Sequence, residues 1–193
     1  MRRFQLIGMA LTLLASGLLG GTAAVLSDEQ EPTLAFDEQT TITFVSVESG
    51  KKMIGTPDRF TKRLGQLEMQ LRMGSPEPVS MQAFLDSLSD GVQAWSPADI
   101  QIVTQAVETL REPMQAYRLP FPEQINLIRV NAQVAQNAPH CRGANIVLPD
   151  RYFADPTLAP VILAHELFHV LSSHNPELRD RLYQIIHFER TNE

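Results

Sequence analysis

The side chains best suited to chemistry lie close together near the end of the chain, in the sequence His165-Glu166-Leu167-Phe168-His169. Residues four apart on an α-helix lie on the same face, one turn above each other. His165 and His169 can therefore direct two imidazole nitrogens at one metal ion. Glu166 is rotated by about 100° from His165, so its carboxylate can lie beside the ion and accept a proton from a water that the ion activates. The pattern predicts a Zn²⁺ site with Glu166 as general base.

The residues around this motif predict a buried helix. Asp155 suits the N-cap position and Pro156 the first helical position, and Pro160 still falls in or near the first turn. The apolar residues up to Ser173 lie nearly all round the helix, which is typical of a buried one. Two histidines and a glutamate in such a helix need partners, because unpaired buried polar groups are costly. A metal ion would satisfy all three, and ordinary core histidines with hydrogen bonds are the alternative.

The N-terminal residues are typical of an export signal. Two arginines, Arg2 and Arg3, precede an uncharged run at residues 4–27 that ends in small residues. This arrangement predicts a secretory signal at residues 1–24, cut after Ala24, and a protein that is periplasmic or secreted. The alternative is an uncleaved membrane anchor, since the run is long enough to span a bilayer. The N-terminal segment would then be the only contact with a membrane.

Composition narrows the possible partners. The chain has 193 residues, which suits one domain, and a formal net charge of −6. An acidic domain without a basic run is a poor candidate for binding nucleic acid or an anionic membrane surface. Cys141 is the only cysteine, so no internal disulfide can form. Stability must then come from the core and from any bound metal.

The remaining pattern predicts an α+β domain at residues 40–193, after an acidic, flexible lead-in at residues 25–39. The strands, found from alternating β-branched and apolar residues, are expected at residues 40–47, 125–130 and 144–149. The helices, found from apolar spacing and caps, are expected at residues 57–72, 80–88, 97–113 and 156–173, with a last helix that starts at Pro176. A turn at residues 49–52 and a loop at residues 137–143 separate these elements.

The motif resembles that of the zincin metallopeptidases, and the order of strand, motif helix, turn and second helix is similar to theirs. The resemblance covers about the last third of the chain. It implies a zincin-like fold: a small sheet whose edge strand packs on a buried active-site helix, with a following helix that carries a ligand. It also implies a zinc-dependent peptidase that hydrolyses peptide bonds in a peptide or protein substrate. The helix-turn-helix is similar, too, to a little-characterised group of exported bacterial proteins, which implies no substrate.

Catalytic zinc usually has three protein ligands, and the resemblance leaves two candidates for the third. The metzincin branch has a histidine six residues after the second motif histidine, where this chain has Asn175. The gluzincin branch takes a glutamate from a following helix, commonly about twenty residues later, where Glu189 lies. Glu193 follows Asn192, and an Asn-Glu pair is also typical of gluzincins, which gives Glu193 a slight preference. Both could face the motif helix if the last helix extends that far.

Weaker candidates surround the motif. Asn145, Ile146 and Val147 are expected at the sheet edge, because Pro149 closes their strand, and could pair there with an extended substrate. An ordinary edge strand is an equal alternative. Cys141 could complete a Cys-His-His site, block the zinc as a thiolate, or be a free buried thiol.

The chain ends at Glu193, in or just after the last helix, so a domain truncated at its C-terminus is one expectation. Gluzincins also carry a downstream histidine or tyrosine that stabilises the oxyanion, for which only Tyr183 and His187 are at hand. The alternative function is an exported metal-binding or protein-binding module on the same scaffold, without turnover.

Overall fold

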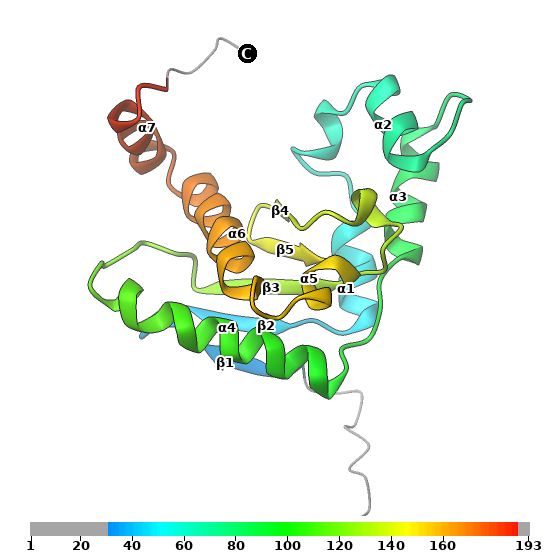
Figure 1. The fold of residues 1–193 in the computed structure, drawn as a ribbon. Helices are drawn as coiled ribbons and strands as arrows, with labels where there is room; N and C mark the ends of the chain where they lie inside the picture. Colours follow the sequence, from blue (N-terminus) through cyan, green and yellow to red (C-terminus); the bar gives the residue numbers. More distant parts are fainter. Residues whose placement is uncertain (1–30, 189–193) are drawn as a thin grey trace, which may run out of the picture.

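The computed structural model describes residues 31–188 of the chain. The predicted signal and both candidate glutamates, Glu189 and Glu193, lie outside these residues. Within them the fold is α+β, as predicted, with a mixed five-stranded sheet that has helices on both faces (Figure 1). The strands are β1 (Thr33–Ala35), β2 (Thr41–Phe44), β3 (Gln124–Arg129), β4 (His140–Arg142) and β5 (Asn145–Leu148).

Seven α-helices and two short 3₁₀ helices connect and cover these strands within residues 31–188. The α-helices are α1 (Val47–Ile54), α2 (Gln66–Met73), α3 (Met81–Asp90), α4 (Pro97–Gln115), α5 (Asp150–Ala154), α6 (Ala159–His174) and α7 (Pro176–Ile185). The 3₁₀ helices are η1 (Thr61–Arg63) and η2 (Val134–Asn137). No helix in this part of the chain has the length and apolar character needed to cross a bilayer.

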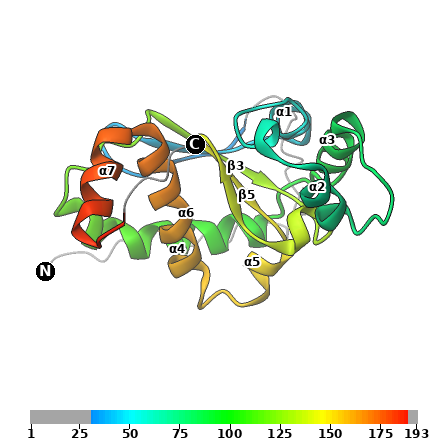
Figure 2. The same ribbon diagram turned by 90° about the horizontal axis from the view of Figure 1, so that it is seen from above.

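The sheet separates two hydrophobic cores. Its strand order is β1-β2-β3-β5-β4, with β2, β3 and β5 parallel and the two outer strands antiparallel to their neighbours. Successive side chains of a strand point to opposite faces. Leu127 and Ile146 therefore enter one core, while Ile128 and Val147 enter the other. Figure 2 shows α4 and α5 on one side of the sheet and α1 and α3 on the other.

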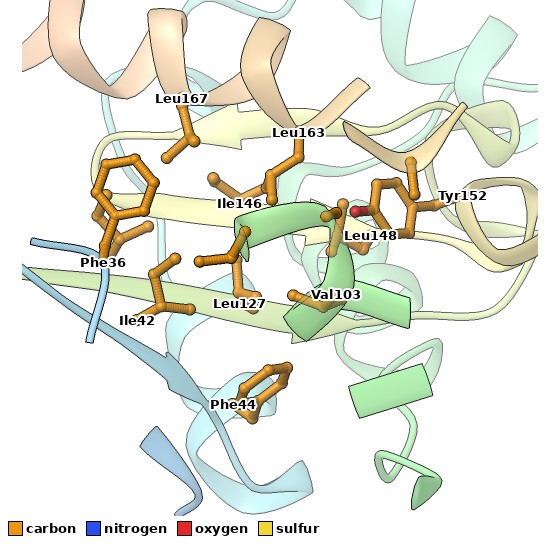
Figure 3. Packing of buried hydrophobic residues seen from close by; sticks show 14 of the residues in the cluster. Phe36, Ile42, Phe44, Val103, Leu127, Ile146, Leu148, Tyr152, Leu163 and Leu167 are labelled. Atoms are coloured by element: carbon orange, nitrogen blue, oxygen red, sulfur yellow. The ribbon is translucent and has the colours of Figure 1, made fainter. Parts of the chain in front are cut away.

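The first core holds α6 in place. Leu163 and Leu167 of α6 point toward the sheet, where Ile146 lies beneath them (Figure 3). Val103 of α4 and Leu127 of β3 belong to the same cluster, and all of these side chains are fully buried. Burying such a side chain contributes about 1.5–3 kcal/mol each relative to leaving it exposed. The face of α6 that these leucines occupy is therefore the face that packs on the sheet.

Several predicted elements are confirmed with shifted ends. The strands β2 and β3 and the helix α3 lie where the sequence places them. Ser96 and Asp99 form the expected capping box at the start of α4, which runs through Pro113 to Gln115. The helix expected at residues 57–72 is divided into η1 and α2.

The flexible lead-in predicted at residues 25–39 is wrong for its described part. Thr33–Ala35 forms β1, which pairs with β2, and Phe36 is buried in the first core. The domain therefore begins before residue 40. A three-residue edge strand is too short to produce a readable alternation, which is why the acidic composition dominated the prediction.

The turn predicted at residues 49–52 is also wrong, because α1 occupies this position. Ser46 caps the helix, and its hydroxyl accepts a hydrogen bond from the backbone N–H of Ser49. Gly50 and Lys51 suggested a turn, yet Gly50 lies inside the helix and is buried. A β-carbon at Gly50 would lie 2.9 Å from Cγ1 of Val92 and 3.3 Å from Cγ2 of Ile128. The glycine is therefore needed for the close approach of α1 to the sheet.

The edge strand is β4 and not β5, which corrects the predicted substrate edge. Asn145, Ile146 and Val147 pair with β3 on one side and with β4 on the other, and Ile146 and Val147 are fully buried. They cannot receive an added strand. The sequence feature that could have indicated β4 is Gly143. It has φ of +65° and lies in the two-residue connection between β4 and β5. A glycine first in such a connection is typical of a hairpin turn.

Buried and stacked groups tie β4 to the segment after α1. The guanidinium of Arg142 donates to Oδ2 of Asp58 at 2.7 Å and to the carbonyl oxygen of Thr56 at 2.9 Å. Burial opposes ionisation of Asp58, but hydrogen bonds from Arg142 and Thr61 outweigh it and lower the pKa of Asp58. His140 stacks on Phe60 at a centroid distance of 6.0 Å. Burial lowers the pKa of His140 from 6.5 to about 4.

We expect Gly50→Ala to lower the free energy of unfolding by about 1–3 kcal/mol, because the new methyl group overpacks the contact with Val92 and Ile128. Alanine normally stabilises a helix relative to glycine, so the close approach of α1 to the sheet is what makes the expected change destabilising. Urea denaturation measures the effect. Lys51→Ala, an exposed position of the same helix, is the control and should change stability by less than about 0.5 kcal/mol. A more stable Gly50→Ala variant would contradict the packing.

We expect the free energy of unfolding to fall as the pH is lowered from 6.5 to about 4, because unfolded His140 binds a proton that folded His140 does not. Asp58 affects the free energy of unfolding in a different pH range. Its lowered pKa contributes stability above pH 3.8 that is lost only at lower pH. Denaturation at a series of pH values, with a chelator present, should show a flatter profile between pH 6.5 and 4 for His140→Gln. Parallel profiles would contradict the role of His140.

Candidate metal centre

The motif lies on α6, as predicted, but the helix begins later than expected. Asp155 follows α5 and forms a local turn in which its Oδ1 accepts from the backbone N–H of Thr157 at 3.0 Å. Leu158 is the N-cap, without a side-chain hydrogen bond, and Pro160 lies in the first turn. The predicted N-cap, Asp155, is therefore wrong: the N-cap lies three residues later, and the side chain of Asp155 instead closes the turn before the helix. The motif remains in the middle of a continuous helix.

The expectation that α6 is buried all round is wrong. Its buried side carries Leu163, Leu167 and Val170, which pack on the sheet and on α4. Val161 and His165 lie on the exposed side. Near its end, α6 also contacts α7 (Figure 1). The two motif histidines are therefore accessible from solvent, His165 more than the half-buried His169.

The structure brings the two histidines together. Nε2 of His165 lies 3.0 Å from Nε2 of His169, and the two rings are nearly perpendicular with centroids 4.6 Å apart. At this distance both nitrogens cannot carry a proton, so at least one lone pair points at the other ring. Two such lone pairs that converge from adjacent helical turns can also bind one cation.

The pair fits two positions of a zinc site. Zinc bonds imidazole nitrogen at about 2.0–2.1 Å, and two tetrahedral ligands at that distance lie about 3.3 Å apart. Small ring rotations would convert the observed 3.0 Å into that spacing. Within residues 31–188, however, no group of three or more histidine, cysteine, aspartate or glutamate side chains could hold a metal ion. The described residues thus supply two candidate ligands, His165 and His169.

Glu166 lies on the inner side of the helix. It is only 3% exposed. A buried carboxylate needs hydrogen bonds to offset the loss of its hydration. Its partner is Cys141 of β4, whose Sγ lies 3.2 Å from Oε2 of Glu166 and 3.0 Å from the backbone carbonyl oxygen of the same residue. No hydrogen bond to Oε1 is formed among the described residues.

Cys141 reaches Glu166 because of the sheet register. Cys141 pairs with Ile146, which faces the first core, so its side chain points toward α6. Burial, and then the negative charge of Glu166, raises the pKa of the Cys141 thiol above its usual range. Cys141 is therefore a protonated hydrogen-bond donor, which does not favour the blocking thiolate considered from the sequence.

The last helix ends before the candidate third ligands. Asn175 precedes α7 as expected, but its side chain donates to the carbonyl oxygens of Leu171 and Pro120 and does not cap α7. The backbone N–H of Phe188 bonds the carbonyl oxygen of Tyr183 at 2.9 Å, and His187 between them has φ of +58°. These features close a helix. α7 therefore ends at Ile185, and the role of Glu189 and Glu193, which lie outside the described residues, stays a prediction.

Aromatic side chains join α7 to the motif. Phe168 lies beside His169 at a ring-centroid distance of 6.4 Å, and the ring of Tyr183 lies 6.4 Å from Phe168 and 6.3 Å from Phe188. Tyr183, considered from the sequence for the oxyanion, thus packs between two aromatic rings. No residue of α7 is fully buried, and the helix leaves the histidines open to solvent.

The comparisons with known proteins add no relative. No protein-family model matches the chain, and neither a curated protein nor a solved structure has detectable similarity to it. The functional argument therefore depends on the motif and on the geometry around it.

We expect His165→Ala and His169→Ala each to weaken zinc binding by at least about 100-fold, because each removes one of the two converging nitrogens. Calorimetric titration of the metal-free chain with zinc, together with the zinc content per chain, measures the loss. His174→Ala is the matched control, since His174 is an exposed histidine at the end of the same helix, and it should bind zinc like the wild type. Full zinc occupancy in His165→Ala would rule out this assignment.

Proposed function

We propose that the protein is a zinc-dependent metallopeptidase with a zincin-like active site. The observation that carries this proposal is the 3.0 Å approach of the two Nε2 atoms of His165 and His169 on one solvent-facing side of α6. Glu166 of the same motif lies between them in sequence and is held against the sheet. The predicted export signal supports a role in the periplasm or outside the cell.

The chemistry follows from the positions of these side chains. His165 and His169 would hold the metal, together with Glu189 or Glu193 as third ligand. A bound Zn²⁺ would polarise the scissile carbonyl group and make water a stronger nucleophile near neutral pH. Glu166 accepts the proton of the attacking water and passes it to the nitrogen of the leaving amine. Its Oε1 is the oxygen that takes this proton, because Oε2 is engaged by Cys141.

We expect an extended substrate to pair at the sheet edge next to the motif. The outer strand β4 contacts α6, and its outer side ends the sheet among the described residues. A peptide pairing along β4 would use backbone hydrogen bonds, which depend little on its sequence. The substrate edge is thus proposed at His140, Cys141 and Arg142, in place of the interior residues of β5.

The alternative is an exported metal-binding or protein-binding module without turnover. It is favoured by the burial of Glu166, which is 3% exposed and bonded to Cys141 of β4, while His165 faces solvent. This module would bind zinc, or a protein partner, through the same exposed side of α6. Zinc binding without any cleavage of peptides would support it over the peptidase.

We expect Glu166→Gln to lower kcat/KM for peptide cleavage by about 10²–10⁴-fold while zinc remains bound, because an amide cannot accept the water proton. A mixture of unstructured proteins serves as substrate, and the appearance of new amino groups measures the rate. Glu177→Gln, an exposed carboxylate in the first turn of α7, is the control and should cleave like the wild type. Unchanged cleavage by Glu166→Gln would exclude this mechanism.

A further inference from the structure

We propose that Cys141 is a positioning residue, whose thiol donates a hydrogen bond to Oε2 of Glu166 and thereby orients the carboxylate of the proposed general base. The inference rests on the proposed function for its catalytic meaning, while the contact itself can be tested without any activity. The motif on α6 contains no indication of this partner, which comes from a different strand 25 residues earlier in the chain.

The first support is geometric. The Sγ atom of Cys141 lies 3.2 Å from Oε2 of Glu166, well within the range for a sulfur donor, and the sheet register directs this side chain at α6. Glu166 is almost completely buried. Among the described residues, this thiol is the only side chain that donates to its carboxylate. A carboxylate on a rotatable side chain that lacks a donor would have several orientations, and a general base needs one.

The second support is the state of the thiol. Burial and the neighbouring charge of Glu166 raise the pKa of Cys141, so the sulfur keeps its proton over the whole range of ordinary pH. A thiol in this state is a poor nucleophile and a poor metal ligand, because the thiolate performs both tasks. Hydrogen-bond donation is the chemistry that remains to it.

An alternative acceptor lies close by. The backbone carbonyl oxygen of Glu166 is 3.0 Å from the same sulfur, and one S–H group can favour only one of the two oxygens. If the proton points to the carbonyl oxygen, Cys141 is an ordinary buried residue that packs β4 against α6. The two cases differ in what happens when the carboxylate is changed.

Infrared spectroscopy of the full chain separates these cases, since Cys141 is the only cysteine and gives the only S–H stretching band. We expect the wild-type band at low wavenumber, because a charged acceptor makes a stronger hydrogen bond. In Glu166→Gln the band should move to higher wavenumber. A band that does not move shows donation to the backbone carbonyl and overturns the proposal, whether or not the protein is a peptidase.

Three substitutions at Cys141 test the consequence for catalysis. Serine keeps a donor, valine keeps an apolar side chain of comparable size without a donor, and alanine removes both. We expect Cys141→Val and Cys141→Ala to lower kcat by about 10-fold or more with KM unchanged, as for residues that orient a catalytic group. Cys141→Ser should restore kcat toward the wild-type value. If valine retains more activity than serine, packing and not donation is the role of Cys141.

Zinc affinity and thermal unfolding of the same variants complete the test. Zinc affinity should be unchanged in all three, and a large loss in Cys141→Val would make Cys141 a ligand and overturn the proposal. Wild-type protein that binds zinc but cleaves nothing would refute the proposed function, while the infrared band would still decide whether the thiol orients Glu166. A variant that does not fold leaves the decision to the wild-type and Glu166→Gln spectra.

Discussion

The rotation of α6 about its own axis is set by the burial of Leu163, Leu167 and Val170 against the sheet and α4. Residues on a helix keep fixed angular positions relative to one another, so this burial also determines where the motif points. His165 is turned to solvent, and Glu166 is carried inward toward β4. The separation of the histidine pair from the Glu166 carboxylate is thus a consequence of core packing.

The position of β4 depends on contacts far from the motif. Arg142 is buried and bonds Asp58 and the carbonyl oxygens of Ile54, the last residue of α1, and of Thr56 just after it. These contacts hold the short outer strand of the sheet, and with it Cys141, beside α6. A three-residue strand with only one neighbour gains little from pairing alone. The second core, under α1 and α3, therefore helps to define the surroundings of Glu166 on the opposite face of the sheet.

The two ends of the candidate site differ in how firmly they are held. The histidines lie on a helix anchored by the largest core cluster, while α7 has no fully buried residue and contacts α6 through its aromatic rings. Asn175 stiffens the junction by donating to Leu171 and Pro120. For the proposed peptidase, an anchored histidine pair beside a lightly packed helix would allow a substrate to approach the histidines.

The sequence by itself determined the α+β class, most helices and the face relation of His165 and His169, because periodicity, caps and the geometry of one helix are local properties. It did not determine which strand lies at the edge, since pairing order depends on contacts between distant residues. The edge was therefore predicted at β5 and is found at β4. The helix α1 was not predicted, because Gly50 suggested a turn, whereas the close packing of α1 on the sheet requires this glycine. Only the tertiary structure showed the contact between Cys141 and Glu166. A contact between a strand and a helix arises from strand register and burial, and the sequence around either residue does not indicate it.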